Sequence, residues 1–557
     1  MKRAGDELFF APLGGVGEIG MNLSIYGVGS ERHRTWLAVD CGVAFGAEDQ
    51  LPGVDVVMPD IRFLVEERRN LVGIVLTHAH EDHFGALLDL WPQLRVPVYA
   101  TPFTAALLEA KRLSEVGAPE IAVTVVELGS RFTLGPFDVE LVSVAHSIPE
   151  SNALIIRTSH GTVLHTGDWK LDPTPTLGPP TDEARLRALG EEGVLALVGD
   201  STNAVRDGRS PSESDVATTL AELIRSAPGR VAVTTFASNV ARIRATAEAA
   251  FAAGREVVVV GRAMERIIQV ARETGYLEGI RSFHSLEVYS QLAPKKVVAL
   301  CTGSQGEPRA ALARVAEDAH PEVSLGKGDR VIFSSRTIPG NEKAVGRIIN
   351  GLIRQGVEVI TDRTQLVHVS GHPRRAELED MIRWVRPQIV IPVHGEALHL
   401  HEHAALARAL LVPQVVCCEN GDLVRLSPGP ASIVDEVPAA RLYKDGKLVV
   451  ESGARTIPDR RRLGFAGLVS IAIAMTEDGE FAADPEIALT GIPERNAEGD
   501  TMADVAHDAA VDTIRHLPRG RRRDPEAVRA AVVAAVRAAL AADWGKKPVC
   551  HVHVLTL

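Results

Sequence analysis

A dense run of metal-ligand side chains, the histidine run at residues 77–83 (THAHEDH), follows a short apolar segment. That segment is rich in β-branched residues and bounded by polar ones, which predicts a buried strand with the histidine run at its carboxyl end. Side chains alternate along a strand, so His78 and His80 point to one side. The turn that follows brings Asp82 and His83 back toward the same space. Imidazole suits zinc and carboxylate suits zinc or manganese, so the run predicts a metal site.

A polar loop that happens to be rich in histidine is the alternative interpretation of the run. It is disfavoured because crowded ionisable groups at the end of a buried strand carry a desolvation cost that a metal offsets. Later strands also end in ligand residues: VSVAH ends at His146 and VLHTGD ends at Asp168. A single strand-end His or Asp is usually structural, but together with the histidine run these two supply the missing ligands. The segment IVIPVH ends at His394 in the same way, with a core histidine as its alternative.

Composition indicates a soluble protein of several domains. The chain has 557 residues, enough for roughly three or four domains of ~150 residues each. Its apolar runs are shorter than the ~20 residues of a membrane helix, and Asp6 and Glu7 stand where a signal peptide would have its apolar core. We therefore expect a cytoplasmic protein with no membrane partner. The net charge of −12 excludes a generally basic surface that coats nucleic acid, but it leaves room for a locally basic groove.

Residues 14–20 contain a literal G-x-G-x-x-G, with Asp40 20 residues after the last glycine. This matches the dinucleotide-binding fingerprint as a pattern, but the fingerprint requires a helix after the glycines. Residues 21–26 instead alternate as a strand does, and residues 36–40 predict another strand. We expect a glycine turn between antiparallel strands, with Asp40 orienting the metal ligands by hydrogen bonding.

The pattern changes after Asp200, which ends one more apolar strand. A capping box at Ser212 predicts the start of a helix, and strands predicted at 230–236, 256–260, 296–301 and 330–334 alternate with helical stretches. This alternation predicts a parallel α/β insert. Its strands end in small polar residues, Ser334 and Ser335 among them. Ligands bind at such strand ends in open α/β sheets, and hydroxyl and amide groups there suit phosphates.

These motifs together resemble a known family. H-x-H-x-D-H followed by His146 and Asp168 resembles the metallo-β-lactamase superfamily, and the insert closed by His372 and His394 resembles the β-CASP nucleases within it. Five runs are similar to the ribonuclease J family of bacteria: GGVGEIGMN (14–22), TGSQGEP (302–308), SSRTIPGNE (334–342), HVSGHP (368–373) and PVHGE (392–396). The resemblance is specific because separated motifs occur in the right order over nearly the whole chain.

The resemblance implies an α/β fold with an αββα core built from residues 1–208 and 366–450. The β-CASP domain, residues 209–365, is inserted into this core. Residues 451–462 are expected to be a linker, and residues 463–557 a small α+β C-terminal domain. In this family that domain is associated with oligomerisation, which implies a homodimer or tetramer; a passive cap is the alternative.

By resemblance, the protein holds two Zn²⁺ ions per subunit, with Mn²⁺ as an activating or alternative ion. One ion is expected on His78, His80, His146 and Asp168, and the other on Asp82, His83, Asp168 and His394, so that Asp168 bridges them. Asp82 is also expected to orient the attacking water. His372 is the candidate general acid or oxyanion donor, and Asp200 is its orienting partner.

The expected function is that of a metal-dependent ribonuclease acting on single-stranded RNA in rRNA processing and mRNA decay. It would have 5′-to-3′ exonuclease activity that prefers a 5′-monophosphate, endonuclease activity, and partners in an RNA-degradation complex. The candidate phosphate-binding residues are His368, Ser370, Gly371, His372, Ser334 and Ser335. A β-CASP DNA-repair nuclease is the nearer alternative, because the hydrolytic chemistry does not depend on the sugar. A small-molecule metallo-hydrolase would not need the insert, and an inactive RNA-binding scaffold would not need every ligand position.

Overall fold

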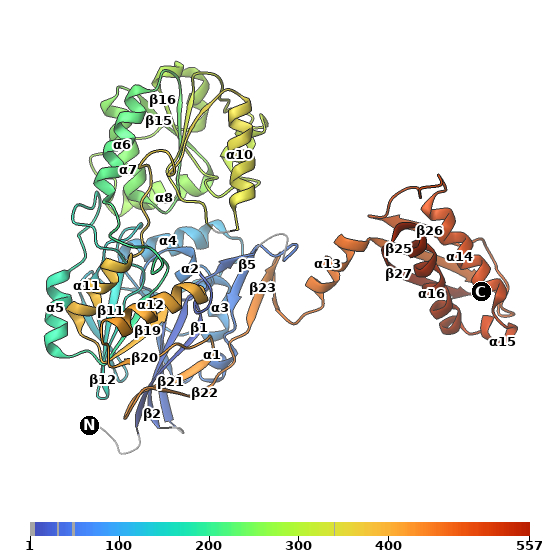
Figure 1. The fold of residues 1–557 in the computed structure, drawn as a ribbon, viewed down its shortest axis with the longest axis horizontal. Coiled ribbons are helices and arrows are strands. Elements are labelled where there is room, and N and C mark those ends of the chain that lie inside the picture. The colour runs from blue at the N-terminus through green and yellow to red at the C-terminus, as the bar shows by residue number, and fades with distance from the viewer. Residues whose placement is uncertain (1–5, 31–32, 47–50, 339) are drawn as a thin grey trace. The chain divides into compact units, whose positions relative to one another are not determined.

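The computed structural model describes residues 6–30, 33–46, 51–338 and 340–557. Residues 1–5 of the expected core and Pro339 of the SSRTIPGNE run therefore lie outside the described residues. The chain forms two compact units, one of Met1–Phe45 with Val56–Lys444 and one of Gly46–Asp55 with Asp445–Leu557. Each unit has a core of its own, and Figure 1 draws the chain coloured from its N-terminus to its C-terminus.

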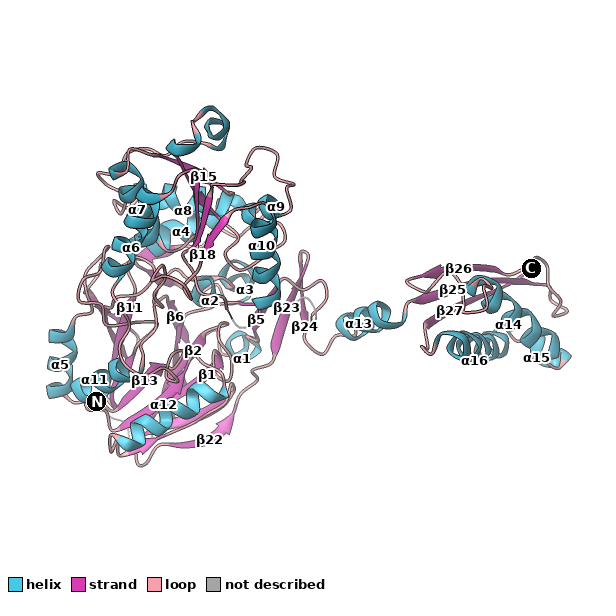
Figure 2. Cartoon of the chain, turned by 45° about the horizontal axis from the view of Figure 1, so that its top comes forward, coloured by secondary structure: helices cyan, strands magenta, loops and turns pink. Residues whose placement is uncertain are grey.

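Two sheets packed face to face form the base of the first unit, drawn in magenta in Figure 2. The strands of one sheet are, in order across it, β22 (Ser432–Glu436), β21 (Asp422–Ser427), β1 (Glu7–Gly14), β2 (Leu23–Ser30), β3 (His33–Val39), β6 (Leu71–Val75), β7 (Val98–Ala100) and β8 (Val123–Val125). The strands of the other are β20 (Gln414–Val415), β19 (Ile389–Val393), β13 (Ala196–Asp200), β12 (Gly161–His165), β11 (Asn152–Thr158), β10 (Phe137–Ser143) and β9 (Arg131–Leu134).

Side chains from both sheets share one buried core, with Phe10 and Tyr26 from the first sheet beside Leu154 and Val198 from the second. Helices cover the outer faces, which completes the αββα layering: α1 (Arg62–Glu66), α2 (Glu81–Phe84), α3 (Leu87–Leu94) and α4 (Pro102–Ser114) by the first sheet, and α5 (Glu183–Glu192), α11 (Arg375–Val385) and α12 (Ala397–Ala409) by the second. Two short strands, β4 (Ala44–Phe45) and β5 (Val56–Pro59), pair beside this core, and β5 also pairs with β23 (Arg441–Asp445). The predicted fold class is confirmed.

The glycine-rich segment is a turn between antiparallel strands, as the sequence predicts. β1 and β2 pair antiparallel from Glu7↔Gly29 to Gly14↔Leu23, and no helix follows the glycines. Gly15 and Gly20 have φ values of +88° and +102°, a backbone conformation that side chains disfavour. The predicted glycine turn between antiparallel strands is therefore confirmed, and a strand stands where the dinucleotide-binding fingerprint requires a helix.

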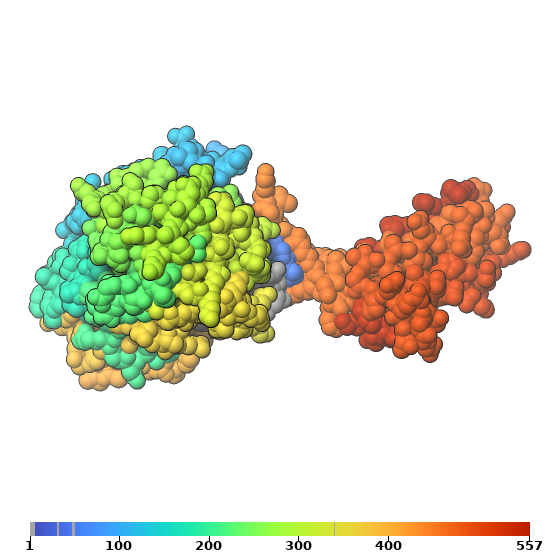
Figure 3. Space-filling view, turned by 90° about the horizontal axis from the view of Figure 1, so that it is seen from above, coloured from blue at the N-terminus to red at the C-terminus, as the bar shows by residue number. Residues whose placement is uncertain are grey.

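The insert is an open sheet of five parallel strands in the order β15 (Glu256–Val260), β16 (Val297–Cys301), β14 (Val231–Thr234), β17 (Arg330–Phe333) and β18 (Glu358–Ile360). Its helices are α6 (Glu213–Ser226), α7 (Val240–Ala252), α8 (Arg262–Glu273), α9 (Ala311–Ala316) and α10 (Glu342–Arg354), with short 3-10 turns at Leu286–Gln291 and Pro294–Lys296. The predicted capping box at Ser212 is present. Seen from above, the residues of the insert form most of the exposed face of the first unit (Figure 3).

The second unit is a small α+β domain with a three-stranded sheet, in which β25 (Leu468–Met475) lies between β26 (Glu486–Thr490) and β27 (Val549–Thr556). Its other elements are β24 (Leu448–Glu451), α13 (Thr456–Ala466), α14 (Met502–His516), α15 (Arg519–Arg522) and α16 (Pro525–Trp544). Val528, Val532 and Val536 are buried in its core, so this helix face is used within the unit. The expected linker is only partly extended, because α13 runs through its second half.

No helix among the described residues is long and apolar enough to cross a membrane. The domain boundaries expected from the sequence stay predictions.

Candidate active site

The ends of neighbouring strands bring the candidate ligands together. β12, β13 and β19 are adjacent and parallel, so their carboxyl ends lie side by side. The chain continues from these ends into Asp168, Asp200 and His394, respectively. β6 ends in the facing sheet just before the histidine run. The parallel pairing of strands that are distant in sequence therefore builds the site.

The first candidate donor set is His78, His80, His146 and Asp168. His80 Nδ1 lies 3.1 Å from His78 Nε2 and 3.0 Å from His146 Nε2. Asp168 Oδ2 lies 3.6 Å from the Nε2 atoms of both His78 and His146. Two donor atoms that share one tetrahedral zinc at ~2.0–2.1 Å must be roughly 3.3 Å apart, so these spacings fit a shared cation.

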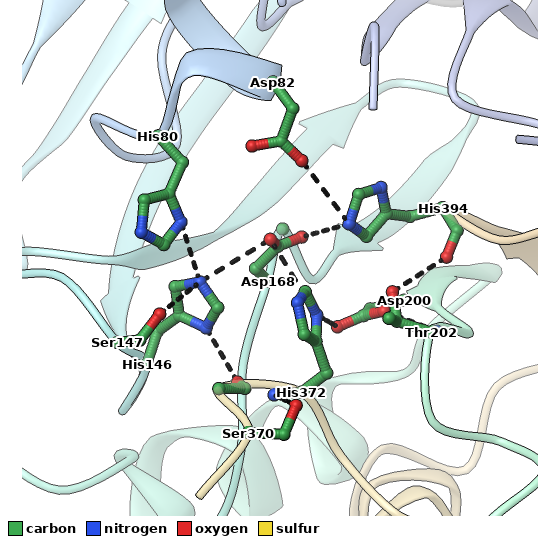
Figure 4. A network of polar contacts seen from close by, with 12 residues as sticks. His80, Asp82, His146, Ser147, Asp168, Asp200, Thr202, Ser370, His372 and His394 are labelled. Carbon is green, nitrogen blue, oxygen red and sulfur yellow. Dashed lines mark hydrogen bonds and ion pairs between the residues drawn. The ribbon is translucent and has the colours of Figure 1, made fainter. Parts of the chain in front are cut away.

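The second candidate donor set is Asp82, His83, Asp168 and His394. His83 Nε2 lies 3.2 Å from Asp168 Oδ2 and 3.6 Å from Asp82 Oδ2. His394 Nε2 lies 3.4 Å from Asp168 Oδ1 and 3.8 Å from Asp82 Oδ2. Asp168 therefore faces both sets with its two carboxylate oxygens, as Figure 4 shows at the centre of the network.

Two buried atoms at this centre have no hydrogen-bond partner among the described residues: Asp168 Oδ1 and His394 Nε2. A buried acceptor without a partner costs about 1–3 kcal/mol, and a cation between the two would satisfy both. The site is therefore suited to metal ions by donor type, by spacing and by these orphaned atoms. Which residues hold which ion stays a prediction.

The protonation states also suit cation binding. Burial lowers the pKa of His80 to about 4 and that of His78 and His146 well below the usual value, so all three imidazoles are neutral, the form that binds metal. Burial acts against ionisation of Asp168, but the surrounding histidines, His394 first, hold the pKa of this carboxyl well below its usual range. A carboxylate is thus available beside the three neutral imidazoles of the first set. In the second set, burial acts to lower the pKa of His83, but Asp168, Asp82 and Asp40 outweigh it and raise this pKa well above its usual value.

Hydrogen bonds on the far ring nitrogens fix the orientation of the candidate ligands. Asp40 Oδ2 accepts from His83 Nδ1 at 2.7 Å and from the Thr77 hydroxyl at 2.9 Å, and that hydroxyl lies 2.9 Å from His78 Nδ1. Asp40 therefore hydrogen-bonds the histidine run as expected, and its role toward a bound metal stays a prediction. The Gly371 carbonyl similarly accepts from His146 Nδ1 at 2.7 Å.

The sequence reasoning missed how the glycine turn holds His394. Asn22 Oδ1 lies 2.9 Å from His394 Nδ1, and the His394 amide donates to the Gly15 carbonyl at 2.7 Å. His394 has a φ of +53°, which is unfavourable for any residue with a Cβ, so these bonds hold a strained backbone. The GGVGEIGMN and PVHGE runs are both visible in the sequence, but neither indicates that it contacts the other.

His372 lies against the same centre from the side of the returning chain. Its Nδ1 lies 2.8 Å from Asp200 Oδ2, and Asp200 Oδ1 accepts from the Thr202 amide at 2.9 Å. Burial acts to lower the pKa of His372, but Asp200 and then Asp168 outweigh it and raise this pKa to about 9. A protonated imidazole held by a carboxylate is a suitable proton donor.

The candidate phosphate-binding residues fall into two groups. Ser370 and Gly371 lie on the loop at His372, where Asn203 Nδ2 donates to the Ser370 hydroxyl at 2.8 Å, and His368 and Ser335 lie at the insert. Ser334 differs, because its hydroxyl is fully buried and donates to the Val367 carbonyl at 2.7 Å. That hydroxyl is already used inside the protein, so the expectation that Ser334 binds phosphate does not fit the structure.

Gly371 offers a direct test of how the loop supports the metal ligands. A Cβ at this position would lie 2.5 Å from Nδ1 and Cε1 of His146. Gly371→Ala should therefore displace His146 and lower metal affinity by about 10- to 100-fold, the usual effect of disturbing a ligand's support. Competition titration with a chromophoric chelator measures this. Gly346→Ala is the matched control, because a Cβ there meets nothing within 4 Å, and equal affinity in the two variants would contradict the prediction.

Comparison with known proteins agrees with the fold. Four family descriptions match the chain: "Beta-lactamase superfamily domain" at residues 30–187, "Ribonuclease J, beta-CASP domain" at 228–352, "Zn-dependent metallo-hydrolase RNA specificity domain" at 356–413, and "Ribonuclease J C-terminal domain" at 455–557. The chain is 54% identical to ribonuclease J of Sinorhizobium meliloti, over 99% of this chain and 97% of that protein. It is 40% identical to ribonuclease J of Thermus thermophilus, over 85% of this chain and 83% of that protein.

A crystal structure of a protein of unknown function from Enterococcus faecalis matches the fold with a TM-score of 0.53. It has 16% sequence identity and covers 75% of this chain and all of that one, so it supports the fold alone. Fold and donor sets define a metallo-β-lactamase-type hydrolase with a β-CASP insert. Within that class, the chain belongs to the ribonuclease J family.

Proposed function

We propose that this metal-dependent ribonuclease removes nucleotides from the 5′ end of RNA, preferring a 5′-monophosphate, and also cuts internal bonds. Its class follows from family membership. The observation that carries the chemistry is the convergence of two donor sets on Asp168, with the His372–Asp200 pair beside them. This arrangement supports the proposal, because groups suited to water activation and to leaving-group protonation lie beside one another.

The donor sets would hold two cations, which we propose are Zn²⁺, with Mn²⁺ as an activating or alternative ion. Mixed imidazole and carboxylate donors suit both metals. When bound, two such cations neutralise charge on the phosphate and lower the pKa of a shared water toward ~7. His78, His80 and His146 would hold one ion, His83, Asp82 and His394 the other, and Asp168 would bridge them.

The residues around the ions have separate tasks in the hydrolysis. Asp82 is partly exposed at the centre, so its carboxylate can orient the attacking water. Attack on phosphorus breaks the P–O3′ bond, and the departing 3′ oxygen needs a proton. His372 supplies it, because Asp200 occupies Nδ1 and leaves Nε2 to face the substrate. The product on the remaining chain carries a new 5′-phosphate, which can serve the next cycle.

Recognition of the 5′ end would use the loop that precedes His372. His368, the Ser370 hydroxyl and the Gly371 amide are proposed to bind the terminal phosphate, with Ser335 at the neighbouring strand end. Asn203 already orients Ser370, since its amide donates both to that hydroxyl and to the His372 carbonyl at 3.1 Å. A pocket sized for a monophosphate would be overfilled by a triphosphate.

The test is a panel of matched substrates: 5′-monophosphorylated RNA, 5′-triphosphorylated RNA and single-stranded DNA. We expect the monophosphorylated RNA to be degraded fastest and processively. Ser370→Ala should narrow the difference between the two 5′ ends while internal cleavage persists, since an internal phosphate needs no terminal pocket. The variant would lose one hydrogen bond from the Ser370 hydroxyl to the charged phosphate. Such a bond is worth about 1.5–3 kcal/mol, so the rate on 5′-monophosphorylated RNA should fall roughly 10- to 100-fold.

Equal rates on the two 5′ ends in the unmodified protein would contradict the exonuclease proposal. Faster hydrolysis of DNA than of RNA would favour the alternative of a DNA-repair nuclease. Hydrolysis of small esters with no action on either polymer would favour a small-molecule hydrolase.

The physiological setting is also a proposal. We propose that the protein acts in the cytoplasm on single-stranded RNA in rRNA maturation and mRNA decay, with partners in an RNA-degradation complex. The match to an RNA specificity domain supports the RNA substrate. We further propose a homodimer or tetramer formed through the C-terminal unit, by a surface other than the buried valine face of α16, with a passive cap as the alternative. Light scattering of the full chain over a range of concentrations tests this.

A further inference from the structure

Four buried charged side chains form a network that the mechanism above does not use: Lys170, Asp172, Glu213 and Arg242. Lys170 Nζ lies 2.9 Å from Asp172 Oδ2 and 3.7 Å from Glu213 Oε1. Glu213 Oε2 accepts from the Arg242 guanidinium at 2.7 Å. All four are almost fully buried, and two positive charges balance two negative ones. Breaking such a buried pair is strongly destabilising, so the network is a fixed element.

The network joins the metal-binding core to the insert. Lys170 and Asp172 follow the strand end that carries Asp168, and the Lys170 amide donates to the Ala145 carbonyl, next to His146, at 2.8 Å. Glu213 begins α6, and Arg242 lies in the first turn of α7. The charges therefore connect the metal-ligand strands to two helices of the insert.

Arg242 extends the connection to the loop that precedes His372. Its guanidinium donates to the carbonyl of Val367, the residue before His368, at 2.8 Å, and to the Ser334 carbonyl at 3.1 Å. The Ser334 hydroxyl donates to the same Val367 carbonyl. Both of these carbonyls accept from Nη1, while Nη2 donates to Glu213, so the two nitrogens of one rigid plane hold the end of β17, the start of the loop and α6 in a single arrangement.

The other end of this loop is tied to the metal centre. The Gly371 carbonyl accepts from His146, and His372 contacts Asp200 (Figure 4). Residues 367–372 are therefore suspended between Arg242 on the insert and His146 with Asp200 on the core. The distance between the metal centre and the residues proposed to bind the 5′-phosphate (His368, Ser370 and Gly371) therefore depends on both attachments.

We propose that Arg242 is a positioning residue that fixes the position of the 367–372 loop relative to the metal centre. This position would matter for cleavage of RNA, which contacts the loop, and not for cleavage of a small phosphodiester, which does not. The inference rests on the proposed function of that loop. Arg242 touches neither substrate nor metal. Its effect passes through the Val367 carbonyl to the groups that contact RNA.

The test compares Arg242→Lys with Arg255→Lys, a matched control in the same sheet. Arg255 is also a buried guanidinium that donates to two carbonyls, those of Gly229 and Ala227, but these lie before β14, at the end of the sheet opposite to Ser334. Both variants keep the positive charge and lose the planar fork. Hydrolysis of 5′-monophosphorylated RNA and of bis(p-nitrophenyl) phosphate is measured on the full chain, together with metal content and Tm.

We expect Arg242→Lys to lower kcat/KM for the RNA by about 10- to 100-fold, the range for a small misplacement of groups remote from the reacting atoms. Its metal content and its hydrolysis of the small diester should stay unchanged, because the small diester needs no loop contacts and has a good leaving group. Arg255→Lys should keep both activities even where its Tm falls. Ser334→Ala, a milder change in the same network, should lower RNA hydrolysis less than Arg242→Lys does and leave small-diester hydrolysis unchanged, and it serves if that variant does not fold.

Equal loss of RNA and small-diester hydrolysis in Arg242→Lys, or equal RNA hydrolysis in the two arginine variants, would overturn the positioning role. If the unmodified protein does not discriminate between 5′ ends, the exonuclease proposal fails by itself. The role of Arg242 is still tested in that case, because the test compares the loss of RNA hydrolysis with the loss of small-diester hydrolysis. This comparison does not depend on a preference between 5′ ends.

Discussion

Replacing His80 with alanine will abolish RNA hydrolysis and lower the metal content of the protein at the same time. His80 Nδ1 is the donor closest to two other donors of its set, within 3.1 Å of His78 and 3.0 Å of His146. Without it, the remaining donors form an incomplete site. A lost cation removes several kcal/mol of transition-state stabilisation, which corresponds to ~10³-fold or more in rate. Metal analysis and RNA hydrolysis on the same preparation measure both effects.

Two controls make this prediction specific. Chelation of the unmodified protein should reproduce the loss, and added Zn²⁺ or Mn²⁺ should restore the activity of the unmodified protein but not of His80→Ala. His401→Ala changes an exposed histidine of α12 and should change neither metal content nor rate. A fully active preparation that contains no transition metal would contradict both the donor sets and the proposed mechanism.

His372→Ala is expected to lower kcat by about 10²- to 10⁴-fold, the usual contribution of a general acid, while metal content stays unchanged. The reason is that the two donor sets are complete without His372, whose Nδ1 is occupied by Asp200. Asp200→Asn should have a smaller effect, because it weakens the orientation and charge of the imidazole but leaves it in place. Single-turnover rates, measured with metal content on the same samples, separate chemistry from RNA binding.

A substrate with a good leaving group gives the deciding comparison. It needs no proton on the departing oxygen, so His372→Ala should hydrolyse bis(p-nitrophenyl) phosphate nearly as fast as the unmodified protein. Loss of metal from His372→Ala would instead reassign this residue as a ligand, since its ring also lies near Asp168 and His394.

Much of the fold and the candidate site was predictable because the signals are local. An apolar β-branched segment followed by ligand residues predicts a strand with a site at its end, and the structure shows this arrangement at His78, Asp168 and His394. The alternation of strands and helices between Asp200 and His372 predicted the parallel sheet of the insert. The expectation of an antiparallel glycine turn was also correct, since a strand pattern follows the glycines directly.

What the sequence did not reveal depends on contacts between distant segments. The hydroxyl of Ser334 follows a strand as a phosphate-binding serine would, but it is buried against Val367 and Arg242, which no local pattern indicates. Asn22 stands in a conspicuous run, yet its contact with His394 spans most of the chain. The second half of the expected linker is helical, because the basic composition that marks it as exposed does not exclude a helix.

The sequence by itself determined the types of candidate donor side chains, the order of the motifs and the alternation of strands and helices in the insert, because these follow from side-chain chemistry and from periodicity along the chain. The αββα layering of the core was implied by the family resemblance. Only the tertiary structure showed how closely the candidate donors lie around Asp168, that the Ser334 hydroxyl is used within the protein, and that Arg242 links the insert to the loop before His372. Those features arise from the parallel pairing of β12, β13 and β19 and from buried charge pairing across the insert. Both bring together residues far apart in sequence, and their free energy is gained only when the whole core has packed.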